Sequence, residues 1–132
     1  MAEISSIEKA LIQKFADKRR VDRYKSLLKG PKHRKKFLDL LNHNFEYNQE
    51  RIVELEKTIS TSDQLLTFLK NKYVNTTCFL VADQNSKDGR ELRLESGVEE
   101  LIENYWGAIL ICPPKPIVIY KSEASSECTV LM

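Results

Sequence analysis

A chain of 132 residues, 42% hydrophobic and 30% charged, has the length and composition of one ordinary globular domain. Its formal net charge of +2 argues against a strongly polyanion-seeking or acid-rich protein, and its longest apolar runs, at 78–82 and 108–112, reach only five residues. A membrane span needs about 20 apolar residues, so the composition predicts no membrane partner.

The first 45 residues have a helical pattern. Apolar residues recur at steps of three and four from Ile4 to Phe15, and again with a shifted phase from Val21 to Leu28. The pair Gly30-Pro31 predicts the end of this helical stretch, because glycine caps helix C-termini and proline cannot continue a helix. A second helix is expected from near Lys32 to residue 45.

The following segment, 51–57, fits two structures. Its spacing allows a short helix, but the β-branched pair Ile52-Val53 and the alternation after it suit an extended strand equally well. The next signal is clearer: Thr61 and Gln64 have the spacing of a capping box and precede an apolar stripe that runs to Tyr73. A helix is therefore predicted to begin at Thr61.

After Asn75 the period becomes strand-like. Asp88-Gly89 predicts a turn, and Ser96 with Glu99 predicts a second capping box, for a helix that buries one face ending at Tyr105. The four strands expected in this part of the chain are Cys78–Ala82, Glu91–Leu94, Ala108–Cys112 and Ile117–Tyr120.

This order of elements predicts an α+β fold: N-terminal helices packed with a small, mostly antiparallel four-stranded sheet that contains one crossover helix. A single domain is expected over residues 1–121, helical and basic in 1–45 and mixed in 46–121. Residues 122–132 are rich in Ser and Glu, and a flexible polar tail is expected there.

The small net charge is a cancellation between two halves of the chain. Residues 1–36 hold 12 Lys/Arg against 4 Asp/Glu, whereas residues 37–132 hold 9 against 15. Such asymmetry indicates contact with a polyanion, or a basic helical layer that faces acidic residues such as Glu99, Glu100 and Glu103 of its own fold or of a partner subunit. The candidate nucleic-acid-binding residues are Lys18, Arg19, Arg20, Arg23, Lys32, Arg34, Lys35 and Lys36.

The three cysteines, at 78, 112 and 128, include no Cys-x-x-Cys pair. An odd number of cysteines, together with an N-terminus that lacks the features of a signal peptide, predicts a soluble protein of the cytoplasm. Cys78 and Cys112 lie in apolar runs and are expected to be buried and unreactive. No metal site is expected, since His33 and His43 are the only histidines, and His43 is interpreted as a helix-capping residue.

No catalytic constellation is visible. Asp83, Asp88 and Glu91, with Arg90 or Arg93, are the only acids and cations spaced as in a metal-dependent nuclease, and they are interpreted instead as turn and hairpin charges. Glycine-rich nucleotide-binding motifs are also missing from a chain with four glycines. The sequence therefore predicts no enzyme, catalytic residue, cofactor or metal.

Two segments resemble an uncharacterised family of small bacterial cytoplasmic proteins. The first is the cysteine-led apolar strand 78–82 followed by Asp88-Gly89-Arg90-Glu91, and the second is 107–114, which runs on to Tyr120 and Glu123. The family has a Pro-Gly turn where this chain has Pro114-Lys115-Pro116. The resemblance implies a small cytoplasmic protein without a known activity, and it assigns no role to any residue.

The function expected from these features is that of a non-enzymatic binding or scaffolding domain that acts through protein–protein contacts. Its partner would be another protein or a second copy in a homo-oligomer, because the oppositely charged halves suit pairing between subunits. The alternative is sequence-indifferent nucleic-acid binding through the basic N-terminal helices.

Overall fold

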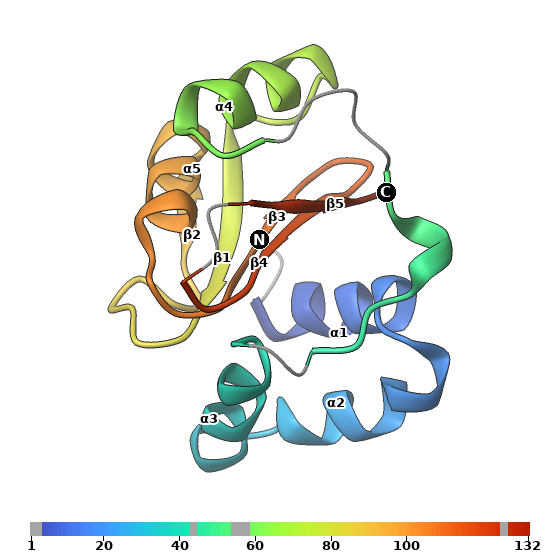
Figure 1. Cartoon of the computed structure of the whole chain (residues 1–132). Coiled ribbons are helices and arrows are strands. Elements are labelled where there is room, and N and C mark those ends of the chain that lie inside the picture. Colours follow the sequence, from blue (N-terminus) through green and yellow to red (C-terminus); the bar gives the residue numbers. More distant parts are fainter. Residues whose placement is uncertain (1–3, 43–44, 54–58, 125–126) are drawn as a thin grey trace.

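The computed structural model describes residues 4–42, 45–53, 59–124 and 127–132. These residues form α helices, short 3₁₀ helices and one sheet, which together make the α+β architecture predicted from the sequence (Figure 1). In chain order the elements are α1 (Ile4–Phe15), η1 (Lys18–Arg20), α2 (Val21–Leu27), α3 (Pro31–Leu40), η2 (Gln49–Arg51), α4 (Ser62–Asn71), β1 (Thr77–Ala82), β2 (Glu91–Arg93), α5 (Leu94–Glu103), β3 (Ala108–Cys112), β4 (Ile117–Lys121) and β5 (Thr129–Leu131).

The strands form one antiparallel sheet in the order β2-β1-β3-β4-β5. The chain passes from β2 to β3 through α5, so α5 is the crossover helix that the sequence predicts. In Figure 1, α1, α2 and α3 lie on one side of the sheet and α4 and α5 on the other. The sheet is therefore the middle of three layers.

Alternation along the strands gives each face of the sheet its own hydrophobic core. On β3, Ile109 and Ile111 pack in the core with residues of α1, α2 and α3, whereas Leu110 and Cys112 pack with residues of α4 and α5. All five residues of β3 are buried. A strand covered on both faces carries a continuous apolar run, which is the pattern that predicts this strand from sequence.

The sheet has one strand more than the four predicted. The additional strand, β5, lies within the segment expected to be a flexible tail, and it pairs with β4 through Val118 opposite Leu131 and Ile119 opposite Val130. Val130 and Leu131 are both buried. Three residues are too few to establish a strand period, and the polar residues before them concealed the strand.

Two helix boundaries also differ from prediction. α5 begins at Leu94 with Arg93 as its N-cap, so Ser96 lies inside the helix and caps nothing. α3 ends at Leu40, short of residue 45, and His43 lies outside the described residues. The capping box of α4 is confirmed, since the Gln64 N–H donates to Thr61 Oγ1 at 3.2 Å and the Thr61 N–H donates to Gln64 Oε1 at 3.3 Å.

The segment predicted as either helix or strand, 51–57, is described only at its start. Arg51 ends η2, and Ile52 forms an isolated antiparallel bridge with Leu131 of β5. Residues 54–57 lie outside the described residues. Within the described ranges, no helix has both the length and the apolar content needed to cross a membrane.

Candidate functional site

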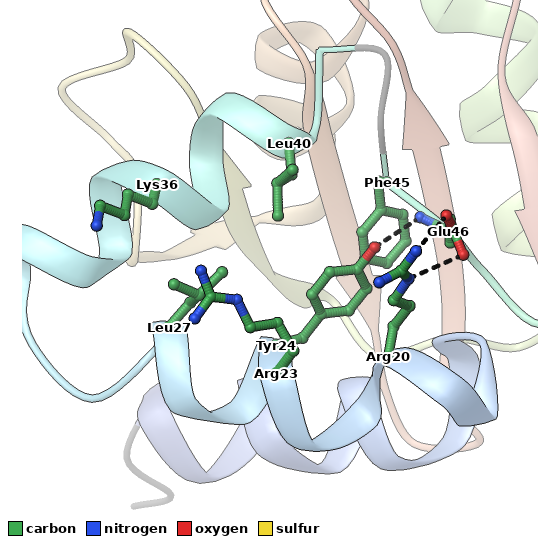
Figure 2. A pocket seen from close by; sticks show the side chains of 8 residues that line it. All are labelled: Arg20, Arg23, Tyr24, Leu27, Lys36, Leu40, Phe45 and Glu46. Atoms are coloured by element: carbon green, nitrogen blue, oxygen red, sulfur yellow. Dashed lines mark hydrogen bonds and ion pairs between the residues drawn. The ribbon is translucent and has the colours of Figure 1, made fainter.

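A cleft of about 560 Å³ lies between α2 and α3. Clefts that hold ligands commonly measure about 300–1,000 Å³. Figure 2 shows the side chains of this cationic cleft, which come from η1, α2, α3 and the chain that follows α3. They are Arg20, Arg23, Tyr24, Leu27, Lys36, Leu40, Phe45 and Glu46.

Gly30 and Pro31 separate the two helices that line the cleft. α2 ends at Leu27, Gly30 is the extended N-cap of α3, and Pro31 occupies its first turn, where a missing N–H costs nothing. Each helix buries one stripe in the core, with Leu27 and Phe37 as examples. The cleft lies beside these buried stripes and is lined by residues of both helices.

The floor of the cleft is aromatic and aliphatic. The rings of Tyr24 and Phe45 are stacked, with centroids 5.3 Å apart and planes inclined by 21°, and Phe37 meets Tyr24 edge-on at 5.8 Å. Tyr24 is only 3% exposed. Leu40 is half-buried and completes the apolar surface from α3. The floor is thus a packed surface whose outer face alone meets solvent.

Glu46 ties the floor to one of the cations. Its backbone N–H donates to the Tyr24 hydroxyl at 2.9 Å, and its carboxylate accepts hydrogen bonds from Arg20 Nε at 3.1 Å and Nη2 at 3.3 Å (Figure 2). The hydrogen bond with Glu46 raises the pKa of Arg20, and burial raises the pKa of Tyr24. At neutral pH the cleft therefore holds a neutral phenol and a paired arginine.

The remaining cations at the rim, Arg23 and Lys36, are exposed. Neither has an ion-pair partner in the part of the chain that the structure describes. The cleft is consequently lined by three cationic side chains and one carboxylate above an apolar floor. Such a site attracts an anionic group and also gives an apolar group a surface on which to pack.

Among the other basic residues singled out from the sequence, Lys18, Arg19, Lys32 and Lys35 are exposed on η1 and α3 outside the cleft. Arg19 forms an ion pair with Asp17 at 3.1 Å. Seven of the eight candidate basic residues are therefore exposed on the helical layer, and three of these seven line the cleft.

Arg34 is the one candidate residue of the eight that is not exposed. Its side chain is 20% exposed and is paired with Glu8 at 2.5 Å and Asp88 at 2.8 Å. Although burial lowers it, the pKa of Arg34 rises overall because of the hydrogen bond to Asp88 and the charges of both carboxylates. The Nε, Nη1 and Nη2 atoms of Arg34 all face carboxylates inside the fold, so its charge is already paired.

The acidic residues of α5 do not neutralise the basic layer. Glu100 is hydrogen-bonded by Lys87 at 2.6 Å and by Asn85 at 2.9 Å, and the hydrogen bond from Lys87 lowers its pKa. Glu99 and Glu103 are exposed, and no ion pair joins them to α2 or α3 among the described residues. In the described residues, the cations of α2 and α3 are therefore not paired with the acids of α5.

The residues weighed as catalytic or metal-binding lie apart from the cleft. Asp83 is bonded to Asn42, Asp88 to Arg34, and Glu91 lies exposed on the edge strand β2. No group of three His, Cys, Asp or Glu side chains that could hold a metal ion occurs in residues 4–42, 45–53, 59–124 and 127–132.

The thiols predicted to be buried are buried. Cys78 and Cys112 are both fully covered. Desolvation raises the pKa of Cys78 to about 12 and also raises the pKa of Cys112. Both side chains are therefore protonated core residues at neutral pH, as their apolar surroundings predict.

Sequence reasoning found the cations of the cleft but missed its floor. The sequence predicts Leu40 and Phe45 as core positions of one helix that continues to residue 45. In the structure α3 ends at Leu40, and the Phe45 ring stacks on Tyr24. The apolar spacing also predicts that Tyr105 is buried on a helix face. Instead, Tyr105 lies beyond the end of α5 and is 58% exposed.

Comparison with known proteins finds no matching family model, no matching curated protein and no matching solved structure. The resemblance to an uncharacterised bacterial family stays a prediction carried by its residues. The function must therefore be inferred from the shape and charge of the cationic cleft.

Proposed function

We propose that this chain is a non-enzymatic binding domain that engages another protein through the cationic cleft between α2 and α3. The observation that carries the proposal is the combination of an apolar floor, formed by Tyr24, Phe45 and Leu40, with the exposed cations Arg23 and Lys36 at the rim. The partner that fits this combination is an acidic protein segment that carries one apolar side chain.

Charge and packing would contribute differently to such binding. The rim cations raise the rate of encounter with an acidic segment, because opposite charges steer association and exposed charges are screened by salt. The apolar side chain supplies the affinity that survives at high salt, because its burial on the floor removes apolar surface from water. The proposal assigns a binding role to the domain and no catalytic step.

A fluorescence-anisotropy titration tests the proposal, with a labelled oligoglutamate peptide that carries a single central leucine as the probe. We expect the double variant Arg23→Glu/Lys36→Glu to weaken binding by more than about tenfold, a loss of about 1.4 kcal/mol. The matched control is Lys9→Glu/Lys29→Glu, which makes the same charge change at exposed positions outside the cleft.

Equal loss of affinity in the cleft variant and the control variant would contradict the proposal, because it would show that net charge alone governs binding. Replacing the central leucine of the peptide with alanine is expected to weaken binding to the wild-type protein. If that replacement changes nothing, the apolar floor has no part in recognition.

A second candidate function is sequence-indifferent nucleic-acid binding. The observation that favours it is the spread of exposed cations beyond the cleft, at Lys18, Arg19, Lys32 and Lys35. If about six cations met phosphates, the logarithm of affinity would fall with the logarithm of salt concentration at a slope near −5. These cations lie on η1 and α3, and neither of these elements has an exposed Phe, Tyr or Trp for a base to stack on, which is why this candidate stands second.

A gel-shift assay at low salt separates the two candidates. Nucleic-acid binding predicts a salt-sensitive shift with duplex DNA or RNA that disappears in the variant Arg19→Glu/Arg20→Glu/Lys35→Glu/Lys36→Glu. No shift with the wild-type protein excludes nucleic-acid binding.

We also propose a cytoplasmic location for this chain. It is supported by the three cysteines, all of them free.

A further inference from the structure

The described part of the chain carries an acidic, aromatic feature that complements the cationic cleft. Tyr105 lies two residues beyond the end of α5 and is 58% exposed. Tyr73, beyond α4, is 88% exposed, but its neighbours in the sequence include the cations Lys70 and Lys72. Its ring meets Trp106 edge-on, with centroids 5.1 Å apart. Exposed aromatic side chains are enriched at protein–protein contacts because they bury a large area with few rotatable bonds.

The turn that carries Tyr105 is held firmly. Asn104 Nδ2 donates to the carbonyl oxygens of Trp106 at 2.7 Å and Asp83 at 3.3 Å, and the Tyr105 carbonyl accepts from the Ala124 N–H at 2.7 Å. The side chain of Lys121 donates to the Asn104 carbonyl. The backbone beneath Tyr105 is therefore already ordered, and binding through this ring costs little further backbone entropy.

The exposed charges of α5 that precede Tyr105 include Glu99 and Glu103. Glu99 and Glu103 are exposed on α5 four positions apart, so they lie on one side of the helix, and Glu103 is the last helical residue before the turn. Neither carboxylate has an ion-pair partner among the described residues. The end of α5 thus presents one aromatic side chain beside two unpaired acids.

We propose that the occupant of the cationic cleft is the Tyr105 turn of a second copy of this chain. The Tyr105 ring packs on the floor beside Leu40 and Phe45, while Glu99 and Glu103 face Arg23 and Lys36. This inference rests on the proposed protein-binding function of the cleft and names its partner.

Each copy carries one cleft and one Tyr105 turn, and these are different surfaces. Two copies that exchange turns reciprocally close as a two-fold dimer, whereas copies joined in one direction form rings or chains. In both arrangements, a copy without a working cleft still offers its turn, and a copy without Tyr105 still offers its cleft. This property makes the proposal testable by complementation.

The test is sedimentation velocity on the wild-type protein and on two variants, Arg23→Glu/Lys36→Glu, which disables the cleft, and Tyr105→Ser, which removes the ring. The wild type is expected to gain mass with concentration, and each variant alone is expected to stay monomeric. An equimolar mixture of the variants is expected to form a one-to-one heterodimer. Lys9→Glu/Lys29→Glu is the control that should associate like the wild type.

A wild-type protein that stays monomeric up to about 1 mM, the weak end of specific affinities, overturns the inference. A mixture of the two variants that associates no more strongly than either variant alone also overturns it. Urea unfolding of each variant confirms that loss of association is not loss of folding. A monomeric wild type that still binds the leucine-bearing acidic peptide would overturn self-association alone, and loss of both activities would overturn the proposed function too.

Discussion

Arg34 on α3 grips Asp88 in the loop between β1 and β2 with two hydrogen bonds, from Nε at 2.9 Å and from Nη2 at 2.8 Å. The same guanidinium reaches Glu8 on α1 at 2.5 Å. Asp88 also accepts the backbone N–H of Ala82 at 2.9 Å. One arginine therefore joins two helices of the N-terminal layer to the end of strand β1.

Replacing Arg34 with methionine is expected to destabilise the fold strongly. The substitution keeps most of the side-chain volume but leaves the carboxylates of Glu8 and Asp88 partly buried and without their cation, a loss of about 3 kcal/mol. Urea denaturation measures it. Lys35→Met, at the neighbouring exposed position, is the control and should change stability by less than about 0.5 kcal/mol; equal effects at the two positions would contradict the ion-pair assignment.

Glu8 gives the fold a specific pH dependence. Burial raises the pKa of Glu8 above its ordinary value of 4.5, although Arg34 opposes the shift. The folded state holds this proton more tightly than the unfolded chain, so the contribution of Glu8 to stability is fully present below pH 4.5 and declines as the pH rises through the folded pKa.

We therefore expect the difference in unfolding free energy between the wild type and Glu8→Gln to move in favour of the wild type as the pH falls from neutral towards 4.5. Urea unfolding at a series of pH values measures this difference, and the glutamine variant cancels the titration of every other group. Movement in the opposite direction would show that Arg34 outweighs burial at this carboxyl.

Gly97 is required by close packing of α5 on the sheet. A Cβ at this position would lie 2.3 Å from Cys78 Sγ and 3.0 Å from Leu110 Cδ1. Gly97→Ala would ordinarily gain about 1 kcal/mol in a helix interior, but here we expect a net loss of about 1–3 kcal/mol from overpacking.

A double-mutant cycle isolates the contact between these two residues. Combining Gly97→Ala with Cys78→Ala removes the sulfur from the path of the new methyl group, so the double variant should be more stable than the sum of the single effects predicts. Thermal unfolding of the four proteins measures the coupling. Strict additivity would contradict the close approach of α5 to β1.

Asn42 joins the end of the helical layer to the start of β3. Its Oδ1 accepts the N–H of Gly107 at 2.7 Å, and its Nδ2 donates to Asp83 Oδ2 at 3.1 Å. Asn42→Ala leaves a buried N–H without a partner, and we expect a loss of about 1–3 kcal/mol. Asn71→Ala at an exposed position is the control for chemical denaturation, and equal losses would contradict the role of Asn42.

The elements with long or chemically distinct signals could be predicted from the sequence. The unbroken apolar run 108–112 indicates a strand buried on both faces, and Thr61 with Gln64 indicates where α4 begins. Asp88-Gly89 indicates a turn, and Gly89 does adopt the left-handed conformation, with φ of 77°. In each of these three elements, the local structure is determined by residues that are neighbours in the sequence.

The features that were missed depend on contacts between distant parts of the chain. β5 forms a strand because Val130 and Leu131 pair with residues of β4. Arg34 is mostly buried because it pairs with Asp88, which lies 54 positions away in the sequence. Charge counting identified the basic layer, but the apolar floor of the cleft depends on Phe45 stacking on Tyr24. No local pattern reveals these pairings.

Occupation of the cationic cleft by the Tyr105 turn of a second copy is tested most directly by ¹H–¹⁵N NMR spectra recorded as the wild-type protein is diluted from about 1 mM. We expect the amide signals of α2 and α3 around the cleft to shift together with those of Glu103 to Trp106, along one common binding curve. Tyr105→Ser should remove both sets of shifts. Spectra that do not change with concentration, or shifts confined to other surfaces, would contradict it.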